Sequence, residues 1–146
     1  MAIISNTNSS GIPLGKLIGL VNQHKERLLH QYLMPLDMTA AQFKVLAVIA
    51  FDGVNSPAEI SKALSIDCGS MTRMVERLVK KSLIEKYPNP DDKRGVVLSL
   101  TTTGQSLLEQ CVDVIEDQVS PLLVGDLSQK EVDQLSQLLK RLLPLQ

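Results

Sequence analysis

The stretch from residue 56 to residue 95 most constrains what this chain can fold into. A capping box with proline at the first helical position predicts a short helix over 56–64. Asp67 is a suitable N-cap for a second helix over 68–81. An apolar hairpin follows, and its tip reads Asn-Pro-Asp-Asp-Lys-Arg-Gly at residues 89–95. Two helices joined by a short turn and followed by a hairpin are the layout of a helix-turn-helix with a wing, which presents one helix to duplex DNA.

The remainder of the chain carries helix signals on both sides of this segment. Pro13 suits the first turn of a helix that Pro35 ends, and Thr39 and Ser128 each begin a capping box. Together the signals predict one helix over 12–34 and another from Thr39 to Asp52-Gly53. A long helix is predicted to begin at 101–103 and to be interrupted at Pro121 and Gly125, and a last helix runs from Ser128 to the C-terminus. Strands are predicted near 84–87 and 96–100. The predicted fold class is mainly α, a winged helix-turn-helix with a small β-hairpin wing.

Length and composition indicate one soluble globular domain. The 146 residues are 44% hydrophobic and 21% charged, which is ordinary for a chain that buries one core. Only 3% are aromatic, which argues against bases stacked on rings. Residues 1–11 are polar and predict a flexible N-terminal tail rather than a signal peptide, and residues 12–146 predict the domain itself. With no apolar run long enough to span a bilayer, we expect a cytoplasmic protein and no membrane partner.

The net charge of −1 hides a segregated distribution. Residues 62–94 carry eight basic and five acidic side chains, a net charge of +3. Residues 104–146 carry three basic and seven acidic side chains, a net charge of −4. An approaching polyanion responds to the local field, so the helix-turn-helix segment is the part suited to nucleic acid.

The two ends of the chain are richer in leucine than a small globule needs. We expect the helices of residues 12–34 and 104–146 to bury this excess against a second copy of the chain, which makes a homodimer. Residues 37–101 then form the DNA-binding lobe. The alternative is that the terminal helices only cover the single core.

Within the predicted helix over 68–81, helical spacing separates an inner from an outer face. The apolar positions at i, i+3, i+4 and i+7 are Met71, Met74, Val75 and Leu78. Arg73 and Arg77 then point away from the core, and a guanidinium can contact two guanine acceptors at once. The alternative is an ordinary solvated face on which Arg73 pairs with Glu76.

The hairpin tip and two helix N-termini supply further candidate DNA contacts. Turn chemistry explains the Asn, Pro, Asp and Gly of the tip, but it does not explain Lys93 and Arg94. An arginine there can enter a narrow minor groove or hold phosphates. The capped helix starts at Thr39 and Ser56 present backbone N–H groups that suit phosphate oxygens.

These residues carry a resemblance to the MarR family of winged-helix transcription regulators. It runs from about Ile12 to Pro144 and rests most on Ile12-Pro13-Leu14-Gly15, residues 36–46, Leu64-Ser65-Ile66-Asp67, Thr72-Arg73-Met74, residues 89–95 and Leu100-Thr101-Thr102. The resemblance implies a homodimer on a palindromic operator, acting as a repressor of an antibiotic- or stress-resistance operon. It also implies release by small phenolic or aromatic carboxylate effectors such as salicylate.

Two sets of site residues follow from the chain and from this resemblance. The predicted DNA-binding residues are Thr39, Ser56, Lys62, Ser70, Thr72, Arg73, Arg77, Lys93 and Arg94. The ligand-binding residues that the resemblance implies are Pro57, Ser70, Thr72, Met74, Arg77 and Lys86. Two positions depart from the family: Ser82 stands where glycine is usual, which predicts a strained left-handed cap, and Lys86 replaces an arginine and its bidentate geometry.

Other classes of function have weaker signals. The chain has no phosphate-binding loop, nucleophile elbow or zinc-protease motif, so we expect no enzyme, no cofactor and no metal site. Cys68 lies at a predicted helix N-terminus, where the dipole favours a thiolate, so a redox-responsive regulator is an alternative. A helical dimer that acts through protein contacts, with a merely solvated basic hairpin, is the alternative from a different class.

Overall fold

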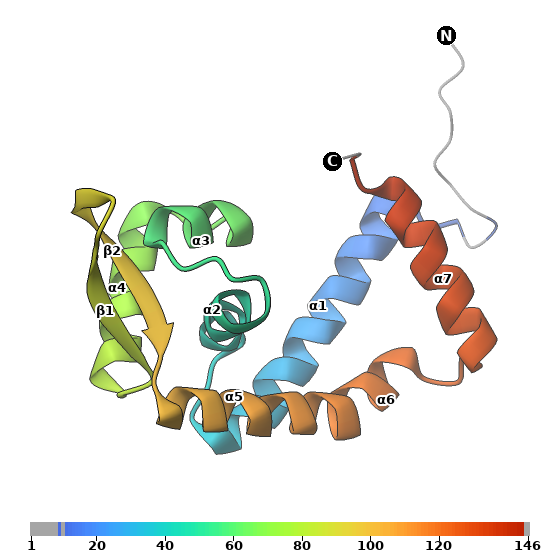
Figure 1. The fold of residues 1–146 in the computed structure, drawn as a ribbon. Coiled ribbons are helices and arrows are strands. Elements are labelled where there is room, and N and C mark those ends of the chain that lie inside the picture. The colour runs from blue at the N-terminus through green and yellow to red at the C-terminus, as the bar shows by residue number, and fades with distance from the viewer. Residues whose placement is uncertain (1–8, 10, 145–146) are drawn as a thin grey trace, which may run out of the picture.

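The computed structural model describes residue 9 and residues 11–144, so most of the tail predicted for 1–11 lies outside the described residues. Its elements, in chain order, are α1 (Leu14–Leu33), a 3-10 turn η1 (Met34–Leu36), α2 (Ala40–Phe51), α3 (Pro57–Leu64), α4 (Cys68–Lys80), β1 (Ile84–Asn89), β2 (Asp92–Leu100), α5 (Thr102–Val114), a π turn η2 (Ile115–Val119), α6 (Ser120–Val124) and α7 (Gln129–Leu142). The strands form an antiparallel hairpin beside α4 (Figure 1). The mainly helical winged fold predicted from the sequence is confirmed.

The helix starts follow from local side-chain chemistry. Thr39 Oγ1 accepts from the Gln42 N–H at 3.0 Å, and Gln42 Oε1 accepts from the Thr39 N–H at 3.2 Å. Ser128 forms the same reciprocal box in α7. At α3 only half of the predicted box is present, because Ser56 Oγ accepts from the Glu59 N–H at 3.1 Å without a reciprocal bond in that cap.

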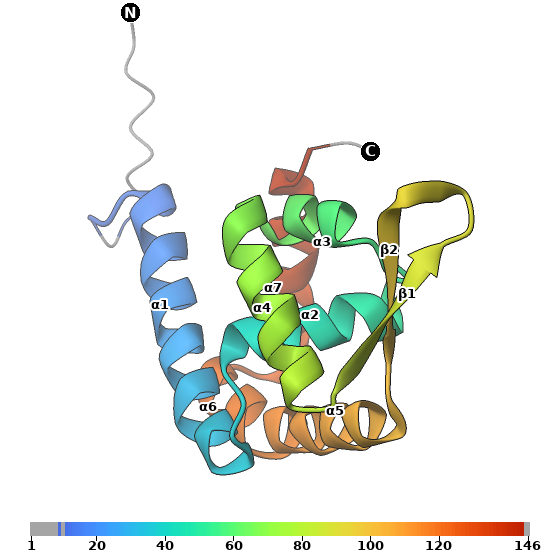
Figure 2. The ribbon, with the colours of Figure 1, turned by 90° about the vertical axis from the view of Figure 1, so that its left-hand side faces the viewer.

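The core lies where α1, α2, α3, α4, the hairpin and α5 meet. Its fully buried side chains include Leu33, Met38, Val45, Leu46, Ile60, Met71, Leu78, Ile84, Leu98, Leu108 and Cys111. Figures 1 and 2 show α5 running along one side of this lobe, α3 and the wing at the opposite side, and α1 standing apart from α4. The core therefore supports α4 from within and leaves its far side uncovered.

The interruption near Pro121 differs from the prediction. Pro121 lies inside the first turn of α6, and the irregular segment is the π turn η2 that precedes it. Proline has no N–H to donate, and its ring clashes with the carbonyl one turn earlier, so the preceding turn widens instead of breaking. Gly125 ends α6 as expected, with a φ of 59° that suits glycine.

The hairpin is longer than predicted. Residues 88–89 and 92–95 belong to the strands, whereas the strands were predicted only near 84–87 and 96–100, with the wing tip at 89–95. Asn89 pairs with Asp92, so the turn itself is only Pro90-Asp91, with a register shift at Pro88/Asn89. The turn signal of Asn, Pro and Asp was identified correctly, but strand pairing continues up to it on both sides.

The two terminal helices leave large apolar side chains uncovered in a single chain. No residue of α7 is buried, and α1 buries only Leu28, Leu29 and Leu33. The large hydrophobic side chains exposed on these two helices are Leu14, Ile18, Leu20, Val21, Leu135, Leu138, Leu139 and Leu142.

Among the described residues no single helix can cross a membrane by length and hydropathy. The segment of α1 with η1 passes that test only together with α2, as a pair bent by 85°.

Candidate DNA-binding surface

Helices α3 and α4 form a helix-turn-helix with a fixed corner. Ser65 ends α3 in the left-handed region with a φ of 53°, and the Ile66 N–H bonds back to the Ser61 carbonyl. Asp67 then caps α4 by accepting from the Ser70 N–H at 2.8 Å. This turn sets α4 across α3, so that Met71, Val75 and Leu78 face the core.

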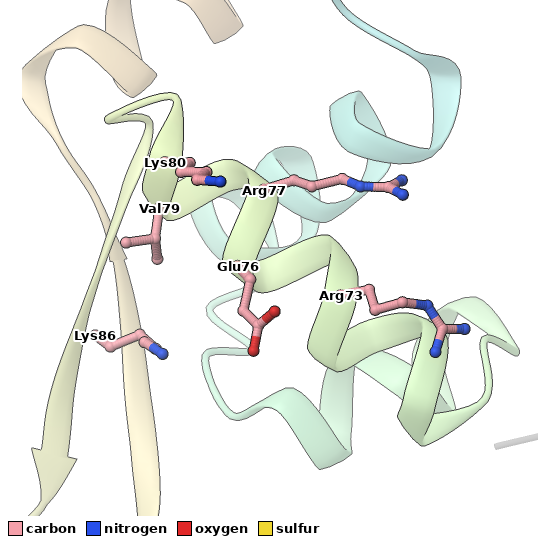
Figure 3. A pocket seen from close by; sticks show the side chains of 6 residues that line it. All are labelled: Arg73, Glu76, Arg77, Val79, Lys80 and Lys86. Atoms are coloured by element: carbon pink, nitrogen blue, oxygen red, sulfur yellow. The ribbon is translucent and has the colours of Figure 1, made fainter.

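The outer face of α4 carries two exposed guanidinium groups. Arg73 and Arg77 both extend from the same side of the helix and away from the hairpin (Figure 3). Arg73 Nη2 donates to Ser70 Oγ at 3.1 Å, and Ser70 Oγ donates to Asp67 Oδ2 at 2.7 Å. Arg73 forms no ion pair with Glu76, and its guanidinium bonds toward the N-terminal turn of α4 instead.

Asp67 is the anionic end of this short relay. The hydrogen bonds from the Ser70 hydroxyl and the Ser70 N–H hold the pKa of the Asp67 carboxyl below its usual range, and the Arg73 charge adds to the effect. The carboxylate therefore stays ionised and orients Ser70, which in turn orients the Arg73 guanidinium. The side chain that can read a base edge is thus partly fixed before any partner arrives.

An open cleft of about 440 Å³ lies between α4 and β1. Its lining consists of four cationic side chains, one carboxylate and one valine: Arg73, Arg77, Lys80, Lys86, Glu76 and Val79. Figure 3 shows Lys86 of β1 and Glu76 of α4 directed toward one another across it. The excess of positive charge makes the cleft attractive to small anions.

The wing projects its basic side chains from a strand. The Arg94 N–H donates to Asp92 Oδ1 at 3.0 Å, and the Asp91 N–H donates to Asn89 Oδ1 at 2.9 Å, so the acidic and amide side chains shape the turn. Lys93 and Arg94 are exposed in the first residues of β2. The prediction that they lie in the tip loop is therefore wrong, because both belong to the strand that follows the turn. Their exposure near the end of the wing agrees with the prediction.

The structure brings some of the predicted site residues together and separates others. Ser70 and Arg73 are hydrogen-bonded, and Arg73, Arg77 and Lys86 line one cleft. The remaining implied ligand residues, Pro57, Ser70, Thr72 and Met74, do not line it. Ser56 follows Asn55, whose carbonyl accepts the Leu98 N–H, so α3 begins beside the hairpin. Thr39 lies near the C-terminal end of α4, because Gln42 bonds both to the Thr39 N–H and to Lys81. Lys62 of α3 and Thr72 of α4 are exposed.

Two features near the end of α4 bear on the site. Ser82 has a φ of 61°, which confirms the strained left-handed position predicted from the missing glycine. Lys81 was not among the predicted site residues, yet its ammonium bonds to the α1–α2 corner. Sequence spacing alone cannot find that link, because its partners lie about forty residues away.

The cysteines differ in environment. Cys68 is exposed in the first turn of α4, whereas Cys111 is buried in α5, where desolvation raises the pKa of its thiol. Across residue 9 and residues 11–144, no three metal-ligating side chains converge.

Comparison with known proteins agrees with this geometry. The MarR family model matches residues 38–96, and the chain is 50% identical over 133 residues to the multiple antibiotic resistance protein MarR of Escherichia coli, covering 91% of this chain and 92% of that protein. The chain belongs to the MarR family. A crystal structure of a cysteine-to-serine variant of E. coli MarR complexed with operator DNA superposes with a TM-score of 0.82 at 48% identity, covering 98% of this chain and 100% of that one. Bordetella bronchiseptica BpsR, whose DNA binding is regulated by 6-hydroxynicotinic acid, superposes at 0.78 with 29% identity, covering 88% and 97%.

Proposed function

We propose that this MarR-family protein is a transcriptional repressor that binds a palindromic DNA operator as a homodimer. The observation that carries the proposal is the exposed cationic face of α4 beside a basic wing, on a fold shared with a relative crystallised on operator DNA. That face lies on the part of the chain with a net charge of +3. Such an activity belongs in the cytoplasm, and because the relatives are regulators we propose no enzymatic role.

The dimer is proposed from the uncovered apolar faces of α1 and α7. Side chains such as Leu138 and Leu142 are each 56% exposed in the single chain, and α7 buries no residue at all. Burying such side chains against a symmetric copy removes apolar area from water at about 25 cal/mol per Å². A two-fold dimer then presents two α4 helices, which fits two half-sites about one helical turn apart.

In the proposed complex Arg73 and Arg77 read or anchor the major groove, and Ser70 and Thr72 allow a close approach of α4. Arg94, with Lys93, enters or borders the adjacent minor groove. Thr39, Ser56 and Lys62 contact phosphates, because helix N-termini and exposed ammonium groups both favour anions. These assignments rest on exposure and charge, and each can be tested by substitution.

The test for DNA binding uses a duplex recovered by selection from a random library with the wild-type protein. Arg94→Ala should weaken binding and lower the slope of log affinity against log salt by about 1. Arg73→Ala should reduce the ratio of selected to random duplex affinity by roughly tenfold, the value of one good bidentate contact. Lys130→Ala, which removes an exposed charge from α7, is the control and should leave both quantities unchanged. A protein that selects no duplex is not a repressor of this kind.

We further propose that small aromatic carboxylates such as salicylate release the protein from DNA. The support is the cationic cleft lined by Arg77 and Lys86, together with the aromatic acid that regulates BpsR. Lys86 offers a carboxylate one point charge rather than a bidentate pair of hydrogen bonds. Removing that charge in Lys86→Met should therefore lower the affinity for a carboxylate by about tenfold. Release requires that the effector bind the DNA-free form better, so equal salicylate affinity by calorimetry with and without the selected duplex contradicts it.

A further inference from the structure

Lys81, the C-cap residue of α4, is bonded to the corner between α1 and α2. Its ammonium donates to the Asp37 carbonyl oxygen and, at 3.3 Å, to Gln42 Oε1. It also lies 3.5 Å from Asp37 Oδ2. The Lys81 N–H bonds back to the Arg77 carbonyl, so the same residue closes α4 and contacts another part of the fold.

The acceptors of Lys81 are held in place by the corner itself. Asp37 adopts the left-handed region with a φ of 55°, and its N–H bonds to the Met34 carbonyl. Gln42 is buried, and its Oε1 also accepts the Thr39 N–H of the capping box. The corner continues directly from α1 through η1, so these bonds join the end of α4 to the helix that carries the exposed apolar face.

Lys81 adds polar bonds to the α1–α2 corner, whereas the buried side chains of α4 (Met71, Val75 and Leu78) belong to the common core. The extensive packing of α4 is against α3 and β1. The Lys81 side chain is only 27% exposed, and its charge is felt by Cys111 of α5, where it opposes the rise in the thiol pKa caused by burial. Lys81 therefore lies where α4 meets α2 and α5, at the end of α4 farthest from Ser70.

We propose that Lys81 is a positioning residue that fixes the tilt of α4 against the α1–α2 corner and thereby sets the half-site spacing the dimer accepts. This inference rests on the proposed function. With 13 residues α4 is about 20 Å long, so a tilt of about 10° at Lys81 moves its N-terminal end by roughly 3.5 Å. That displacement is about the rise of one base pair. One base pair also rotates the half-site by about 35°, so a loosened pivot should reduce the penalty for altered spacing rather than remove it.

The test uses the duplex selected by wild-type protein and versions of it with one base pair inserted or removed at the symmetry centre. We expect each change to lower wild-type affinity about tenfold and Lys81→Met affinity about threefold or less. Lys81→Arg, which keeps a charged donor, should restore the wild-type spacing profile. Lys130→Met is the charge-matched control, and Lys81→Gln is the second variant if Lys81→Met does not fold.

The outcomes separate this inference from the proposed function. If Lys81→Met and Lys81→Gln both keep the wild-type dependence of affinity on spacing, the inference about Lys81 is overturned. It is also overturned if Lys81→Arg shows the weakened dependence expected of Lys81→Met. A fall of about 1 in the salt slope with the spacing profile retained makes Lys81 a phosphate contact and also overturns it. A wild-type protein that selects no duplex defeats the proposed function, and this inference with it. General destabilisation lowers affinity for every spacing alike, so it does not reproduce the expected result.

Discussion

Gly104 lies at the closest backbone approach recorded for any glycine among the described residues. It is buried in the first turn of α5, where a Cβ would lie 2.0 Å from the Leu83 carbonyl oxygen and 2.9 Å from its carbon. Both distances are well inside the 3.4 Å at which ordinary contact begins. That oxygen accepts the Thr101 N–H at 3.0 Å and so joins the start of β1 to the end of β2. Because the obstacle is backbone, no side-chain rotation relieves it.

We therefore expect Gly104→Ala to destabilise the protein. Displacing the Leu83 carbonyl loses a hydrogen bond to a buried acceptor, about 1–3 kcal/mol, and forces a shift in a packed region, about 1–3 kcal/mol more. The gain in helix propensity from glycine to alanine, about 1 kcal/mol, offsets part of this. The net loss is about 1–5 kcal/mol in the free energy of unfolding, or a fall in Tm of roughly 3–15 °C.

The assay is urea and thermal unfolding at one fixed protein concentration, since a dimer's stability depends on concentration. Ser106→Ala, an exposed substitution in the same helix, is the matched control and should change stability by at most a few tenths of a kcal/mol. If Gly104→Ala unfolds within about 0.5 kcal/mol of wild type, the wing base does not approach α5 as described.

Three other outcomes follow from the structure. The Lys44 ammonium lies 2.6 Å from Glu26 and holds the pKa of that carboxyl below its usual range by hydrogen bonding. Glu26→Gln should therefore cost up to about 1 kcal/mol of stability at neutral pH. The difference in stability from wild type should vanish as pH falls through the lowered pKa. Iodoacetamide should label Cys68 rapidly and Cys111 only on unfolding, as mass spectrometry can show, and operator affinity unchanged after Cys68 is oxidised would exclude the redox alternative. Leu138→Asp should convert a dimer into monomers in sedimentation analysis, whereas a monomeric wild type contradicts the proposed assembly.

The features predicted well from the sequence are those decided by residues close together in the chain. Capping boxes at Thr39 and Ser128 involve residues three apart, so their side chains indicate the helix starts directly. The inner and outer faces of α4 follow from helical spacing and needed no knowledge of the fold. The strained left-handed cap at Ser82 could be predicted because serine stands where the family usually has glycine.

What the sequence did not reveal depends on contacts between distant segments or on how two local preferences compete. Pro121 signals a helix break, but widening the preceding turn lets the helix continue past it. The strands extend to the wing turn because pairing satisfies backbone groups that turn propensity leaves open. The link from Lys81 to Asp37 joins positions 44 residues apart, and a lysine at a helix end looks the same whether it is solvated or bonded.

Arg77 connects the two halves of the proposed function. It belongs to the exposed cationic face of α4 and also lines the cleft that contains Lys86. Its side chain borders the cleft while its guanidinium extends away from the hairpin, so a carboxylate bound beside Lys86 would lower the positive charge that α4 offers to DNA. Such neutralisation lowers DNA affinity without a large change of shape, because a smaller positive charge on α4 reduces the electrostatic part of binding. Release by a small anion is then reciprocal: whatever factor salicylate imposes on operator affinity, the operator must impose on salicylate affinity.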